Sequence, residues 1–167
     1  MAHSTVATAS TECHPQEMKR IHLLRIALVC FLPILSAAAQ EKGYWRAAST
    51  TAKGVTGDVS FSDTKITLNF SSFTIAQIRA LEPAEAQALF SADPGGNGNL
   101  YHLEIPSDKR FLHHNTLCGS EETQWAITYV TGRSLQMAFF SGPSIPTLTP
   151  DAISNSARLC GTYSYVR

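Results

Sequence analysis

The chain has 167 residues, of which 44% are hydrophobic and 16% are charged, and its 13 basic and 13 acidic side chains balance. This length suits one ordinary domain with a core of its own. Nucleic acids and anionic membrane surfaces both attract a clustered basic face, and no run of more than two Lys or Arg occurs after residue 39. We therefore expect neither a nucleic acid nor a membrane surface as the main partner.

The N-terminal part has the organisation of a secretory leader. Lys19, Arg20 and Arg25 form a basic region, an apolar stretch covers residues 26 to 35, and Ala37-Ala38-Ala39 has the small-residue pattern of a cleavage site. The pattern predicts cleavage after Ala39. The protein is then exported to the periplasm or the extracellular space, and it meets the membrane only transiently, through this signal peptide.

This interpretation divides the chain into two parts: residues 1–39 are an N-terminal extension and signal peptide, and residues 40–167 are a single β-rich mature domain. A membrane anchor is the alternative, but a spanning helix needs about 20 apolar residues, and Arg25 and Pro33 interrupt this stretch. Acylation of Cys30 is a further alternative, for which the residues before the cysteine are a poor match. Met18 is an alternative start of the chain.

Cleavage leaves two of the four cysteines, Cys118 and Cys160. An even number of cysteines in an exported domain predicts a disulfide bond. On the chain-entropy model, closing a loop of this length stabilises the fold by about 4 kcal/mol. A redox or metal-binding pair is the alternative, but the chain has no C-x-x-C motif.

Alternation of apolar and polar residues predicts that most of the mature part is β-strand. In one expected hairpin, for example, Ile66, Leu68 and Phe70 share an apolar face. Two strands near the C-terminus are apolar on both faces, which predicts that their hairpin is the most buried. The expected strands are residues 44–49, 55–62, 65–70, 73–78, 101–105, 124–131, 135–141 and 159–166.

Residues 82–90 are rich in helix formers, with Pro83 at the first helical position, and they predict one short helix. Asp93 to Asn99 has the composition of a flexible loop. The predicted fold is therefore mostly β: a small antiparallel barrel or strongly curved sheet of seven to eight strands, with one short helix and one disulfide. A sandwich is the alternative.

Gly43-Tyr44-Trp45 resembles the G-x-W motif that opens lipocalin and other calycin barrels. The resemblance implies that Trp45 packs at the closed end of a barrel, where a basic residue after the last strand crosses it; Arg167 has the right position in the sequence. The alternative is that Trp45 is an ordinary core residue. Separately, Asn115 to Gly119 together with Leu159 to Tyr165 resembles small exported bacterial proteins of uncharacterised function. That resemblance supports the disulfide and implies no activity.

The densest cluster of chemically active side chains comprises His102, Glu104, Asp108, His113 and His114. Adjacent residues of an extended segment point in opposite directions, so both neighbouring histidines would not ligate one metal ion. No G-x-S-x-G motif is present either. We therefore assign no catalytic residue, no metal ligand and no cofactor, and we leave the ligand-binding residues open.

Three functional hypotheses follow. The leading one is an exported, non-enzymatic binding module for a small apolar molecule or for an envelope or secreted protein. The second is a hydrolase inhibitor that inserts the loop from Asp93 to Asn99 into a partner's cleft. The third is a metal-dependent enzyme that uses the histidine-rich segment.

Overall fold

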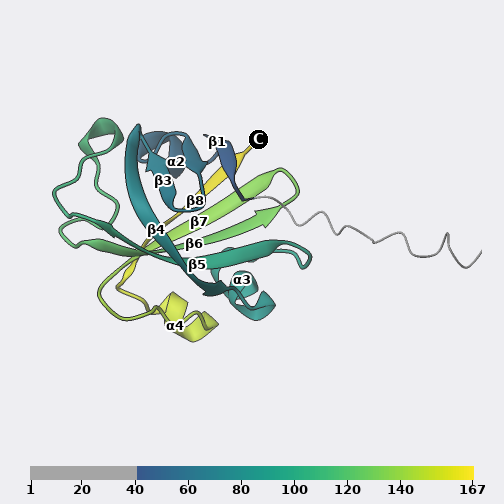
Figure 1. Ribbon diagram of the computed structural model, residues 1–167. Helices are drawn as coiled ribbons and strands as arrows, with labels where there is room; N and C mark the ends of the chain where they lie inside the picture. Colours follow the sequence, from purple (N-terminus) through teal and green to yellow (C-terminus); the bar gives the residue numbers. More distant parts are fainter. Residues whose placement is uncertain (1–40) are drawn as a thin grey trace, which may run out of the picture. The chain divides into compact units, whose positions relative to one another are not determined.

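Eight antiparallel strands pair in chain order, and the last pairs with the first, so the sheet closes into a barrel (Figure 1). This computed structural model describes residues 41–167; the predicted signal peptide, its cleavage after Ala39 and the first two cysteines lie outside the described residues. The barrel predicted from the alternation is confirmed. The strands are β1 Gly43–Ala47, β2 Val59–Phe61, β3 Lys65–Leu68, β4 Ser71–Ala80, β5 Asn97–Ile105, β6 Thr123–Thr131, β7 Ser134–Ser141 and β8 Leu159–Val166.

The barrel interior is filled by apolar side chains from its strands. The inward-pointing residues of the strands form one continuous core. Members of this core without solvent-accessible surface are Trp45, Ile66, Leu68, Leu135, Met137, Phe139 and Tyr165. A cavity large enough for water would expose its lining, so the interior is closely packed at these positions.

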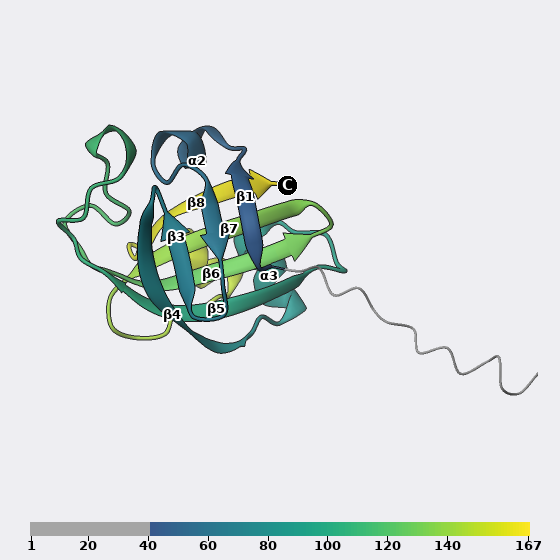
Figure 2. The same ribbon diagram turned by 45° about the horizontal axis from the view of Figure 1, so that its top comes forward.

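A second core lies on the outside of β5, β6 and β7. Two helices, α3 (Pro83–Phe90) and α4 (Pro150–Ser154), cover this face, as Figure 1 shows; Figure 2 shows α3 behind the strands in the turned view. Leu89 of α3 packs there against apolar residues of the three strands. Because β6 and β7 are covered on both sides, they are apolar on both faces, as predicted. The strand residues of this outer core are Leu100, Trp125, Ile127, Ala138 and Phe140.

The structure has more helical turns than the single short helix predicted. That helix is α3, and two five-residue helices, α2 (Thr50–Gly54) and α4, accompany it with a 3-10 turn, η1 (Leu112–His114). The side chains of Ser49 and Thr149 cap α2 and α4, because they accept hydrogen bonds from the backbone N–H groups of Ala52 (3.1 Å) and Ala152 (3.4 Å).

The turn between β3 and β4 lies two residues earlier than predicted. The alternation favoured strand through Phe70 and a break at Ser71-Ser72, but the pairing of Leu68 with Ser71 makes Asn69 and Phe70 the turn. Both have left-handed backbones, with φ of 44° and 62°. Asn tolerates this conformation, which a two-residue hairpin turn requires. Phe70 therefore leaves the apolar face on which the alternation had placed it.

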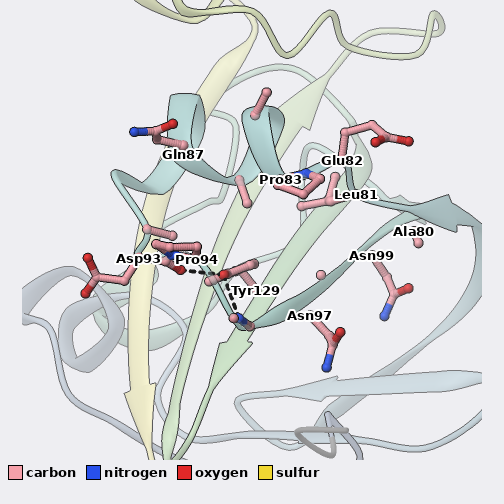
Figure 3. A pocket seen from close by; sticks show the side chains of 16 residues that line it. Ala80, Leu81, Glu82, Pro83, Gln87, Asp93, Pro94, Asn97, Asn99 and Tyr129 are labelled. Carbon is pink, nitrogen blue, oxygen red and sulfur yellow. Dashed lines mark hydrogen bonds between the residues drawn. The ribbon is translucent and has the colours of Figure 1, made fainter.

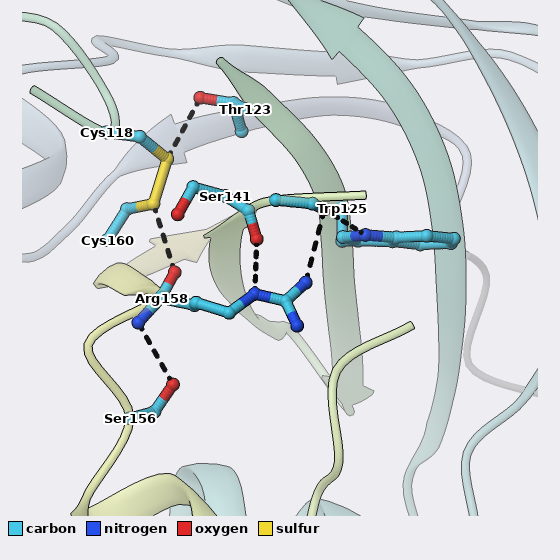
Figure 4. Close-up of a disulfide and its surroundings, with 8 residues drawn as sticks. Cys118, Thr123, Trp125, Ser141, Ser156, Arg158 and Cys160 are labelled. Atoms are coloured by element: carbon cyan, nitrogen blue, oxygen red, sulfur yellow. Dashed lines mark hydrogen bonds between the residues drawn. A yellow bond between two sulfur atoms is a disulfide. The ribbon is translucent and has the colours of Figure 1, made fainter. Parts of the chain in front are cut away.

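The predicted disulfide between Cys118 and Cys160 is confirmed, and its Cα atoms are 4.8 Å apart (Figure 4). It ties β8 to the loop before β6. Simple alternation along β8 would turn Cys160 away from Tyr163. The register shifts opposite Phe139 and Phe140, however, and Cys160 packs against the interior core that contains Tyr163.

Candidate functional site

Phe70 is the most unusual surface residue of the described chain. It sits at the tip of the β3–β4 hairpin and is 100% exposed. The left-handed conformation of a bulky residue costs about 1–2 kcal/mol of backbone strain. Because the ring of Phe70 is exposed, no hydrophobic burial offsets this cost. The fold therefore gains nothing from Phe70, which makes it a candidate for contact with another molecule.

Tyr44, on the outer face of β1, is a second exposed aromatic residue beside the same region. Its hydroxyl donates a short hydrogen bond to Asp58, whose other carboxylate oxygen accepts from the backbone N–H of Ala47 at 2.8 Å. These bonds hold the pKa of Asp58 below its usual range, and the bond to Asp58 raises the pKa of Tyr44. The carboxylate therefore stays ionised at neutral pH and fixes the tyrosine ring.

A groove of 320 Å³ lies between these two aromatic residues. Val59 and Leu112 contribute apolar lining, while Asp58, Ser60 and Thr67 supply polar groups. We call this region the Tyr44–Phe70 surface. Aromatic side chains beside an apolar groove with polar groups around it are typical of the centres of protein interfaces.

A larger pocket of 640 Å³ lies between α3 and the segment that leads into β5 (Figure 3). Its apolar lining includes Leu81, Pro83 and Pro94. Glu82 and Asp93 are the acidic residues in its lining, which contains no His, Cys, Lys or Arg. This α3 pocket therefore has no nucleophile with an adjacent base, and its charge favours neutral or cationic groups.

Tyr129 fixes the loop at the base of the α3 pocket. Its hydroxyl donates to the carbonyl of Asp93 at 2.7 Å and accepts from the N–H of Gly96 at 2.9 Å, as the dashed lines in Figure 3 show. A Cβ at Gly96 would lie 2.5 Å from the tyrosine ring, so only glycine fits there. The loop predicted over Asp93 to Asn99 is shorter than expected, because β5 begins at Asn97.

The histidine-rich segment does not assemble into a metal site. His102 lies on β5 and packs edge-on against Trp125, with 4.9 Å between ring centroids. His113 and His114 are exposed in η1 with left-handed backbones, so they are not on an extended segment as assumed. Within residues 41–167, no three His, Cys, Asp or Glu side chains are grouped to hold a metal ion.

Trp45 and Arg167, the two residues named in the G-x-W resemblance, are in contact. The tryptophan is fully buried, and the guanidinium carbon of Arg167 lies 4.1 Å from its ring centroid. The indole N–H donates to the carbonyl of Glu41 at 2.8 Å. This is a cation–π contact between β1 and the residue that follows β8. Membership of the lipocalin family stays a prediction, because one such contact does not establish descent.

Comparison with protein-family models, curated proteins and solved structures gives no match to this chain. Of the helices that the structure describes, none has both the length and the apolar character needed to cross a bilayer.

Proposed function

We propose that this protein is an exported, non-enzymatic binding module that docks on an envelope or secreted protein through the Tyr44–Phe70 surface. The observation that carries the proposal is Phe70, fully exposed in a backbone conformation that disfavours it. Aromatic residues of this kind supply much of the binding energy of interfaces. Tyr44, held by Asp58, adds a second ring whose ordering on binding costs little entropy.

The barrel interior favours a surface partner over an enclosed ligand. The alternation of the sequence alone allowed a small apolar molecule inside the barrel, whereas side chains fill the interior around Trp45, Met137 and Tyr165. A ligand there would have to displace part of the core. A protein partner on the outside requires no such rearrangement.

We further propose that the chain reaches this partner by export, with cleavage after Ala39. The disulfide between Cys118 and Cys160 supports an oxidising compartment such as the periplasm or the extracellular space. The partner would then be an extracytoplasmic protein.

Site-specific photo-crosslinking in the exporting cell tests the docking proposal. A crosslinking amino acid replaces Phe70, and in a matched control it replaces Ser134, which is exposed on the turn that enters β7 at the opposite end of the barrel. We expect one discrete protein adduct from position 70 and none from position 134. The adduct should disappear when Tyr44→Ala is added. The same adducts from both positions would contradict the proposal.

A hydrolase inhibitor is the second candidate, because Tyr129 fixes the loop from Asp93 to Gly96 by two hydrogen bonds. An inhibitory loop must keep one conformation in its partner's cleft, since a mobile loop loses entropy on binding. Inhibition assays against secreted hydrolases test this candidate. Tyr129→Phe keeps the ring and removes both bonds, so any inhibition should weaken by about tenfold, as expected for the loss of roughly 1–2 kcal/mol. Inhibition that Tyr129→Phe leaves unchanged would exclude this loop.

A further inference from the structure

Asp58 gives the groove of the Tyr44–Phe70 surface a negative charge. It is the charged residue among the described residues that line the groove, and the rest of the lining is apolar, hydroxyl or amide. Hydrogen bonds from Tyr44 and Ala47 hold its pKa below the usual range, so the carboxylate is ionised at neutral pH. The groove is therefore complementary to a cation.

Both carboxylate oxygens of Asp58 can accept further hydrogen bonds. Oδ2 accepts from the hydroxyl of Tyr44, and Oδ1 accepts from the backbone N–H of Ala47 at 2.8 Å. An ionised carboxylate has about four acceptor positions, so each oxygen keeps one. Asp58 is exposed, which leaves these positions open to another molecule. A planar group with two parallel N–H donors can bond to both oxygens at once.

No cation of the described chain is paired with Asp58. The two ion pairs within residues 41–167 use the carboxylates of Asp63 and Glu85. Arg46 is near enough for its charge to lower the pKa of Asp58, but it forms no ion pair with that carboxylate. The position beside Asp58 is therefore available to a cation from outside the described chain.

The rings of Tyr44 and Phe70 add a second attraction for a cation. Both line the groove, and both are exposed. A guanidinium group is attracted to the face of an aromatic ring, stacks on it through its own plane and is more weakly hydrated than an ammonium group. The groove volume of 320 Å³ is close to that of the smallest ligand sites, about 300 Å³, which suits a single side chain.

We propose that the Tyr44–Phe70 surface binds an arginine side chain of the partner protein, whose guanidinium group pairs with Asp58 and stacks on Tyr44 or Phe70. This inference rests on the proposed docking function and adds the chemistry that the partner presents. Arginine fits better than lysine, because its fork of N–H donors matches the two open carboxylate positions and its plane matches the rings.

Nuclear magnetic resonance titration of the exported protein tests this proposal without the partner. The probe is N-acetyl-arginine amide, and the matched control is N-acetyl-citrulline amide, which has nearly the same shape but no charge. We expect the arginine probe to shift the backbone amide signals of Gly57, Ser60 and Asn69 with a Kd on the order of 10 mM. The citrulline probe and N-acetyl-lysine amide should each bind at least about threefold more weakly.

Two variants assign the binding to the groove. Asp58→Asn removes the charge and keeps the shape, and it should weaken binding of the arginine probe by about fivefold or more. Phe70→Gly removes a ring and should weaken it by about threefold, which keeps the test available if Asp58→Asn does not fold. Asp63→Asn is the matched control, because Asp63 lies outside the groove and pairs with Lys42. It should bind the probe as the wild type does.

The outcomes separate this inference from the docking proposal. No shift at the groove, or equal affinity for the arginine and citrulline probes, would overturn the arginine assignment, and so would an affinity that Asp58→Asn leaves unchanged. A discrete crosslinked adduct from position 70 would still support docking in each of these cases. Binding of the arginine probe without any adduct would support the guanidinium site and contradict the protein partner.

Discussion

Phe70 connects a local backbone property to the proposed function. Its φ of 62° favours glycine, and its ring makes no buried contact that would offset the strain. A residue whose conformation is unfavourable for the fold is a candidate for another purpose, and the purpose that we propose is contact with a partner.

Phe70→Gly should therefore stabilise the protein. The backbone strain that glycine relieves in the folded state is larger than the entropic cost of its greater freedom in the unfolded chain. We therefore expect the free energy of unfolding to rise by about 0.5–1 kcal/mol. Urea denaturation measures it. Phe70→Ala is the matched control, because it removes the ring but keeps the Cβ, and its stability should stay near that of the wild type. Destabilisation by the glycine would show that the ring supports the fold.

Tyr163 predicts a loss of stability at alkaline pH. Burial raises its pKa to about 12, whereas the unfolded value is about 10. The stability from this group is complete below pH 10 and is lost as the pH rises toward 12, because the unfolded chain deprotonates first. When the pH is raised from 9 to 11, the free energy of unfolding of Tyr163→Phe should fall by about 1 kcal/mol less than that of the wild type. Urea denaturation at the two pH values measures this difference. Identical losses would contradict this assignment.

At the scale of elements, the connection between β7 and β8 is held from two sides. The guanidinium of Arg158 donates to the carbonyls of Ser141 at 2.8 Å and Gly142 at 3.2 Å, and the indole of Trp125 donates to Gly142 at 2.9 Å. Two residues farther on, Cys160 is bonded to Cys118, so the start of β8 is fixed both covalently and by hydrogen bonds (Figure 4).

Loss of this disulfide should weaken the whole barrel. The cysteines are separated by 42 residues in sequence. Closing a loop of that length corresponds to about 4 kcal/mol on the chain-entropy model. We expect the free energy of unfolding of the double variant Cys118→Ser and Cys160→Ser, measured by urea denaturation, to be lower than that of the wild type by about this much. The wild type in reductant should show the same decrease. A decrease of less than about 1 kcal/mol would show that the hydrogen bonds of Arg158 hold the start of β8 without the disulfide.

Alternation predicts the three C-terminal strands best. β8 begins and ends at the predicted residues, and β6 and β7 differ from prediction by one residue at the start. Elements fixed by backbone conformation were missed, because alternation carries no information about φ. The β3–β4 turn is one example, although Asn69 is a residue that tolerates the left-handed region. The helices α2 and α4 are others, signalled by the caps Ser49 and Thr149 and, for α4, by Pro150 at its first position.

For the whole molecule, the antiparallel barrel of about eight strands and the disulfide could be predicted from the sequence, but the candidate site could not. Phe70 was placed in the apolar face of a strand, and only the pairing of Leu68 with Ser71 shows that it lies in the turn. The groove beside it brings together Tyr44, Asp58 and Leu112, which are far apart in sequence. Such contacts depend on how strands pair and how loops pack on them, which no local pattern encodes.

The export of the whole molecule has a direct test in its mass. Protein recovered from outside the cytoplasm, without reductant, should have the mass of residues 40–167 less two hydrogen atoms, because cleavage follows Ala39 and one disulfide forms. Intact mass spectrometry resolves both changes. A full-length cytoplasmic protein with free thiols would contradict the proposed localisation.

The docking claim is tested most directly by titration calorimetry of the crosslinked partner with the wild type, Phe70→Gly and Phe70→Ala. We predict that both variants bind at least about tenfold more weakly, as for an aromatic residue at the centre of an interface, although neither is less stable than the wild type. Unchanged affinity in both variants would show that the Tyr44–Phe70 surface is not where this protein binds.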